Sequence, residues 1–173
     1  MTCMTDKATL RMDNPFWQFS LAVYADPAVA ATCLDLQDRY GADVNLLLLA
    51  AWLGAARGLR LEPADLAFLP GAGFRDGVIH PLRTARRHLR GQGTADPALE
   101  ALYQEVKQVE IAAERVRQAE LFAWAEARWT TGAPARGRAR VNLTLLLNNA
   151  PDMLLDRLAM AAEAHFPELF AAP

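Results

Sequence analysis

An asparagine or aspartate followed directly by proline occurs three times in this chain, each time before a stretch with helical apolar spacing. The pairs are Asn14 with Pro15, Asp26 with Pro27, and Asp96 with Pro97. Asn and Asp are favoured N-caps because the side-chain oxygen accepts a hydrogen bond from a free backbone N–H, and proline suits the first helical position. No stretch shows the strict alternation that indicates a half-buried strand. We therefore expect an all-α fold.

The same signals and the spacing of apolar residues divide the chain into about seven helices. Their expected ranges are 14–24, 27–40, 44–57, 81–91, 96–128, 141–149 and 151–165, with a further short helix at 62–68. Pro70, Gly71 and Gly73 are typical of a turn or loop. The range 96–128 is the clearest, because its apolar residues recur at steps of three and four and form one stripe. They are Leu99, Leu102, Val106, Val109, Ala113 and Val116.

The length of the chain, 173 residues, is typical of one domain. A hydrophobic fraction of 53% is enough for a sizeable core and lies outside the range of disordered chains. We expect a flexible N-terminal tail at 1–12 and one helical domain, a single-domain bundle, at 13–173. A stretch rich in glycine, alanine and arginine predicts a loop at about 130–138.

The cysteines and the apolar runs indicate the compartment. Cys3 and Cys33 have no spacing typical of a metal site or a disulfide framework, so a reducing compartment fits best. Residues 1–14 are polar and mixed in charge, unlike a signal peptide. The longest apolar run, 44–56, is shorter than the roughly 20 residues that span a membrane. We expect a cytoplasmic protein with no membrane partner.

Two predicted helices carry charged residues that could meet in the folded chain. Arg83, Arg86 and Arg87 lie on one of them, and Glu110 and Glu114 lie four residues apart on the long helix. Neighbouring glutamates repel unless a cation lies between them, and an antiparallel helix with these arginines would provide it. We favour an ion-pair lattice that fixes the register of the two helices. The alternatives are a partly buried Arg/Glu pocket for an anionic ligand and plain solvated surface.

A second candidate site is the segment 37–45. Asp43 is expected to be an N-cap, and Asn45 follows it among leucines. A buried amide without partners costs about 1–3 kcal/mol, so bonds from Asn45 to neighbouring backbone are the simplest interpretation. The alternative is that Asn45 lines a ligand pocket together with Asn142. Both asparagines follow the same pattern in similar leucine-rich segments, which leaves an internal duplication open.

Other side chains show no catalytic pattern. The histidines have no metal-ligand spacing, so neither a metal nor a cofactor is expected. Ser20 lacks the context of a nucleophile elbow, and its hydroxyl is expected to bond back to its own helix. Cys33 has the spacing of a small core residue. The tryptophans, Trp17 among them, are expected in the core.

Several blocks of the sequence recur together in a known family. They are FWQFSL from Phe16, CLDLQD from Cys33, DVNLLL from Asp43, PLR from Pro81, and the pair Arg86 and Arg87. These blocks resemble a family of bacterial conserved hypothetical proteins over most of residues 16–120. The resemblance implies a bacterial origin and a domain of unknown function with no settled activity.

Three hypotheses for the function remain open. A net charge of -2 gives no global reason to expect nucleic acid as a partner, and no catalytic constellation is visible. A non-enzymatic binding or regulatory module, with a protein or a small anionic ligand as its partner, is therefore the first hypothesis. The second is a helical enzyme or small-ligand carrier that uses the Arg/Glu pocket. The third is a weak nucleic-acid binder that uses two basic segments, 75–90 and 128–140.

Overall fold

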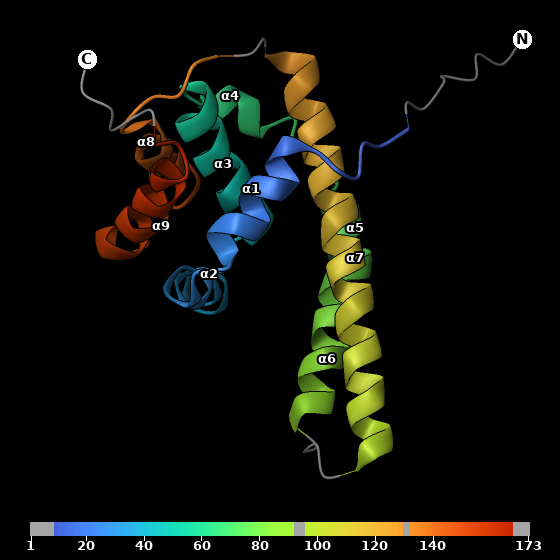
Figure 1. Cartoon of the computed structure of the whole chain (residues 1–173). Coiled ribbons are helices and arrows are strands. Elements are labelled where there is room, and N and C mark those ends of the chain that lie inside the picture. Colours follow the sequence, from blue (N-terminus) through green and yellow to red (C-terminus); the bar gives the residue numbers. More distant parts are fainter. Residues whose placement is uncertain (1–8, 92–95, 130–131, 168–173) are drawn as a thin grey trace, which may run out of the picture.

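A computed structural model describes residues 9–91, 96–129 and 132–167, and most of these residues are helical (Figure 1). In chain order the elements are α1 (Pro15–Tyr24), α2 (Pro27–Tyr40), α3 (Val44–Arg57), α4 (Pro63–Leu66), α5 (Ala72–Phe74), η1 (Arg75–Ile79), α6 (His80–Gly91), α7 (Pro97–Arg128), α8 (Arg138–Leu146) and α9 (Asp152–Ala164). No strand occurs in the described ranges, so the prediction of an all-α domain is confirmed. Because α5, η1 and α6 are continuous, these ranges contain eight helices, against about seven expected.

Each of the three predicted cap–proline pairs begins a helix. The side chains of Asn14, Asp26 and Asp96 each accept a hydrogen bond from a backbone N–H of the following turn, at 2.9, 2.8 and 2.8 Å. Asp43 caps α3 in the same way, 3.0 Å from the backbone nitrogen of Asn45. Local side-chain bonds therefore set where four of the helices begin.

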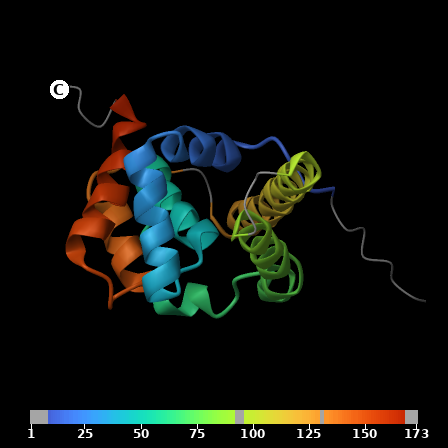
Figure 2. The ribbon, with the colours of Figure 1, turned by 90° about the horizontal axis from the view of Figure 1, so that it is seen from below.

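The helix α3 is the centre of the body of the molecule, with α1, α2, α8 and α9 around it (Figures 1 and 2). Eleven of its residues are buried. α8 comes so close that a Cβ at Gly54 would lie 2.4 Å from the backbone nitrogen of Ala139. The second half of α7 completes the core with Leu121 and Phe122. A single apolar core thus holds the body together.

The helix α6 and the first half of α7 form a hairpin that extends away from the body (Figures 1 and 2). None of the residues of α6 is buried. The apolar stripe of α7 is covered only in part, because Ala113 is buried whereas Leu102 and Val109 are 44% and 53% exposed. The hairpin therefore buries much less apolar surface than the body.

The helix that carries the arginines begins earlier than predicted. The expected turn at 70–73 reaches only Gly71, and helical backbone continues from Ala72. The next five residues form the π-helix η1, which ends shortly before Pro81. A proline inside a helix lacks an N–H and crowds the preceding turn, and a widened turn accommodates it. Pro81 therefore lies inside a helix, and the predicted start near this residue is wrong.

The expected loop at 130–138 is described at 132–137, where the chain is not helical. Positions 130–131 lie outside the described residues. The loop runs directly over the end of α3, since a Cβ on Gly132 would lie 1.9 Å from the carbonyl oxygen of Arg57. Glycine is therefore required where these two backbones meet.

Most of the predicted tail at 1–12 also lies outside the described residues, which begin at position 9. Its last residue contacts the long helix, because the carbonyl of Met12 accepts a hydrogen bond from Nε of Arg115 at 3.0 Å. The end of this segment is thus attached to α7.

The helices α1 and α2 meet at a bend of 101°. As a bent pair they have the length and composition of a membrane span, whereas no single helix among the described residues does. Buried side chains from both helices belong to the core of the body: Phe16, Phe19, Val23, Val29, Cys33 and Leu36.

Candidate functional site

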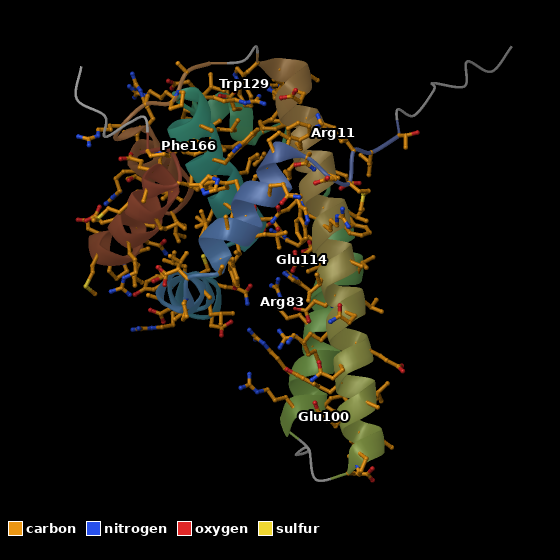
Figure 3. The ribbon with its side chains drawn as sticks, in the orientation of Figure 1. Arg11, Arg83, Glu100, Glu114, Trp129 and Phe166 are labelled. Atoms are coloured by element: carbon orange, nitrogen blue, oxygen red, sulfur yellow. The ribbon has the colours of Figure 1, made fainter. Side chains whose placement is uncertain are left out.

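A cleft with a volume of about 670 Å³ lies between the hairpin and the body. Residues of α1, α2 and α3 form one wall, and residues of α6 and α7 form the other. Figure 3 shows Arg83 and Glu114 on the side of the hairpin that faces the body. Six of the seven residues predicted for the site line the cleft: Asn45, Arg83, Arg86, Arg87, Glu110 and Glu114.

Ion pairs join the two helices of the hairpin along the cleft. Nη2 of Arg83 lies 2.6 Å from Oε1 of Glu114, and its Nε lies 3.7 Å from Oε1 of Glu110. Nε of Arg86 lies 2.5 Å from Oε2 of Glu110. The hydrogen bond to Glu110 raises the pKa of Arg86 although burial opposes it. Arg83 thus contacts both glutamates, as the lattice requires, and the residues of this lattice also line the cleft.

Asn45 connects this lattice to the body. Its Nδ2 donates to Oε2 of Glu114, and its Oδ1 accepts from Nε2 of Gln118 at 3.0 Å. The expectation that its amide bonds only to neighbouring backbone is therefore wrong, because both partners are side chains of α7. Asn45 thus holds Glu114 from the side opposite Arg83.

Asp43 does not line the cleft. Besides its capping bonds, its Oδ2 lies 3.5 Å from Nη1 of Arg75. It lies in an adjoining cavity of about 100 Å³, together with His80 and Arg83. The cap prediction is confirmed by the bonds to α3, and Arg75 is a partner that the sequence did not indicate.

Asn142 lies away from the cleft. It is fully buried, its Nδ2 donates to the carbonyls of Ala50 and Leu59, and its Oδ1 accepts from the backbone N–H of Leu61 at 2.9 Å. Its role is to hold the chain after α3 against α8. A pocket lined jointly by Asn45 and Asn142 is therefore not formed.

Arg87 reaches across the cleft to the body. Its Nη2 lies 2.5 Å from Oδ1 of Asp38 on α2, and both side chains are about half exposed. The hydrogen bond from Arg87 lowers the pKa of Asp38. This contact joins the hairpin to α2 at the surface.

Two cations in the cleft have no partner among the described residues. Arg90 and Lys107 line it, and neither forms a hydrogen bond or an ion pair within the part of the chain that the structure describes. The lining includes five cationic side chains and three carboxylates, which gives an excess of two positive charges. The arrangement therefore favours an anion in this cleft.

The wall of the body is largely apolar. Leu21 and Leu34 of this wall are 48% and 44% exposed, and Ile111 of α7, on the opposite wall, is 41% exposed. Trp17 lines the cleft as well, although it was expected in the core. Burial raises the pKa of Tyr24, another lining residue, to about 12. None of these residues was among those predicted for the site.

The inner part of the cleft has two buried polar side chains that are not fully bonded. Ser20 and Gln118 are each 3% exposed. Oγ of Ser20 and Oε1 of Gln118 have no hydrogen-bond partner among the described residues. The predicted bond from Ser20 to its own helix is therefore absent. Unsatisfied polar atoms are costly, so packing alone does not account for these two side chains.

A second hollow, of about 640 Å³, lies on the face formed by α2 and α9. Its charged residues already have partners. Arg157 donates to Oγ1 of Thr32 at 3.3 Å, and Oδ1 of Asp156 lies 2.6 Å from Nε of Arg140. Arg157 and Asp156 thus each have a hydrogen-bond partner among the described residues, unlike Arg90 and Lys107 of the cleft.

The two basic segments lie far apart. Residues 75–90 belong to the hairpin, whereas 128–140 follow the opposite end of α7 (Figure 1). In the second segment, Arg128 lies 3.2 Å from Oδ1 of Asp65, and Arg140 is paired with acids of α9. The arrangement does not support a nucleic-acid binder that uses both segments at once.

Comparison with known proteins identifies a family but no function. The family model described as "Protein of unknown function (DUF2390)" matches residues 15–121. A search of the curated proteins found no match, and a search of the solved structures found none either. The matched residues include every residue that lines the cleft, from Trp17 to Gln118. The model covers more than half of the chain, and the protein therefore belongs to the DUF2390 family.

Proposed function

We propose that this protein is a binding module whose cleft takes a small ligand with an oxyanion group. The observation that carries the proposal is the pair Arg90 and Lys107, two cations that face the cleft without partners among the described residues. A charge-assisted hydrogen bond to such a group is stronger than a neutral one. The volume of about 670 Å³ lies within the range of small-molecule sites.

The contacts that Glu110 and Glu114 already make favour a binding role over a catalytic one. Glu110 and Glu114 both contact arginines, and Glu114 also accepts from Asn45. Carboxylates engaged in this way orient the arginines and have little freedom to transfer a proton to a ligand. We therefore propose a non-enzymatic role, with the Arg/Glu lattice as a scaffold for the cations.

We also propose a bacterial cytoplasm as the place of action. The support is the absence of a cysteine-pair spacing in the sequence and the family resemblance described above. The burial of Cys33 without a disulfide is compatible with this proposal.

Titration calorimetry with pyrophosphate and with hexyl phosphate tests the proposed function. We expect the wild-type chain to bind hexyl phosphate, and the double variant Arg90→Gln/Lys107→Gln to bind it at least tenfold more weakly. This estimate takes one lost charged hydrogen bond as about 1.5–3 kcal/mol.

The matched control is Arg39→Gln/Arg60→Gln, which removes the same charge from two exposed side chains outside the cleft. It should bind as the wild type does, and circular dichroism should show that both double variants are folded. If no oxyanion binds, or if both double variants lose affinity equally, the proposal is wrong.

A further inference from the structure

We infer that the ligand is a single-chain amphiphile, with its oxyanion head at Arg90 and Lys107 and an apolar chain along Leu21, Leu34 and Ile111. The inference rests on the proposed function and adds the chemical class of the ligand. It follows from the exposed apolar side chains that line the cleft, from the shape of the cleft and from the placement of its charges.

The exposed apolar side chains of the cleft are the first step of the argument. Leu21, Leu34 and Ile111 come from three different helices, and each is more than 40% exposed although it faces the same cleft. Apolar surface in contact with water is unfavourable by about 25 cal/mol per Å². A ligand that only carried charge would leave this surface wet, whereas a ligand with an apolar chain would cover it.

The shape of the cleft is the second step. On α7 its lining extends from Tyr103 to Gln118, which corresponds to about 22 Å along a helix. The volume of about 670 Å³ is small for such a length, so the space is long and narrow. It suits an extended chain better than a compact polyanion, and it is too small for a folded protein partner.

The placement of the charges is the third step. Arg90 lies near the end of α6 and Lys107 lies in the first half of α7, so the antiparallel hairpin brings both toward its outer part. Ile111 lies one helical turn further in than Lys107. The cleft is thus cationic toward its outer end and has exposed apolar side chains on both walls, as a ligand with one charged end and one apolar body requires.

A homologous series tests the inference on the full chain. Butanoate, hexanoate, octanoate and decanoate, and the matching alkyl phosphates, are titrated calorimetrically below their critical micelle concentrations. Affinity should rise with each added methylene by up to about fourfold until the chain fills the cleft. The two series should rise in parallel, because the head and the chain contact different residues.

Two single variants locate the chain. Ile111→Gln should reduce the gain in affinity per added methylene, because it replaces an exposed apolar side chain of the cleft with an amide. Val109→Gln changes an exposed apolar residue of the same helix that does not line the cleft, and it should leave the gain unchanged. Both positions are exposed, so both variants should fold. The titrations of the wild-type chain test the dependence of affinity on chain length even if a variant does not fold.

The possible failures are distinct. If affinity is independent of chain length while Arg90→Gln/Lys107→Gln still weakens binding, the inference is overturned and the proposed function stands. If no member of either series binds, the inference is overturned, and the proposed function is wrong as well unless pyrophosphate binds. Binding that appears only above the critical micelle concentration, or only to anionic vesicles, indicates a lipid surface and overturns the inference as well.

Discussion

At the scale of single residues, the buried asparagines Asn45 and Asn142 show that the same side chain can serve different purposes. Asn142 bonds only to backbone, at Ala50, Leu59 and Leu61, and so holds the fold of the body. Asn45 bonds to side chains of α7 and so positions a wall of the cleft. Because the sequence around both is similar, their difference depends on what each helix packs against.

Two weakly acidic side chains, the buried Cys33 and the partly buried Tyr24, predict that alkali destabilises the protein. Burial raises the pKa of Cys33 from 9.0 to about 12 and that of Tyr24 from 10.0 to about 12. Between these values the unfolded chain loses protons that the folded chain keeps, so the free energy of unfolding falls as the pH rises. Below about pH 8.5, where the unfolded groups are also protonated, this contribution to stability is fully present.

Urea unfolding at about pH 7 and about pH 10.5 checks this expectation. The variant Cys33→Ala should show a smaller fall in the free energy of unfolding between the two pH values than the wild type does. A stability that is equal at both pH values would contradict the prediction.

At the scale of elements, the contact between α3 and α8 depends on one missing side chain. A Cβ at Gly54 would lie 2.4 Å from the backbone of Ala139, so Gly54→Ala must push the two helices apart. We expect the free energy of unfolding to fall by about 1–3 kcal/mol. Chemical denaturation followed by circular dichroism measures the change.

The control is Gly73→Ala in α5, where a Cβ would meet no atom within 4 Å. Alanine is favoured over glycine in a helix by about 0.5–1 kcal/mol, so this variant should be neutral or slightly more stable. Equal destabilisation by both substitutions would show that the α3–α8 contact is not the cause.

The elements also show what local sequence can and cannot predict. Asn14, Asp26, Asp43 and Asp96 were identified as caps because capping involves only residues within one turn. The π-helix before Pro81 was missed, since the same proline is equally suited to the first turn of a new helix. Only the packing of this segment against α7 decides between the two.

At the scale of the whole molecule, a well-packed body carries a hairpin with little core of its own. Most residues of α3 are buried, and none of α6 is. Amide hydrogen exchange should therefore be slowest in α3 and much faster in α6, because local opening of the hairpin exposes little apolar surface.

Decanoate, which would contact both walls of the cleft, should slow hydrogen exchange in α6. If α6 exchanges as slowly as α3 without ligand, this description of the hairpin is wrong.

The same division explains which parts of the site were predictable. The arginines and glutamates were found because helical spacing and a short connection bring α6 and α7 together. Trp17 and Tyr24 were not predicted to line a site, and the pairing of Asp38 with Arg87 was not predicted either, since these contacts form only when α1 and α2 dock beside the hairpin. That docking depends on contacts between distant parts of the chain, which no local pattern encodes.

Because α7 is long, a small rotation at one end displaces its other end by a much larger distance. The helix has 32 residues, its second half is fixed in the core, and its first half forms the cleft. Glu100 lies about 26 Å along the axis from Arg117, so a rotation of about 5° at the fixed half would displace Glu100 by about 2 Å. At Tyr103, the outermost residue of α7 that lines the cleft, the same rotation gives about 1.8 Å. A small change in the angle of α7 would therefore alter the width of the outer end of the cleft without any rearrangement of the side chains that line it.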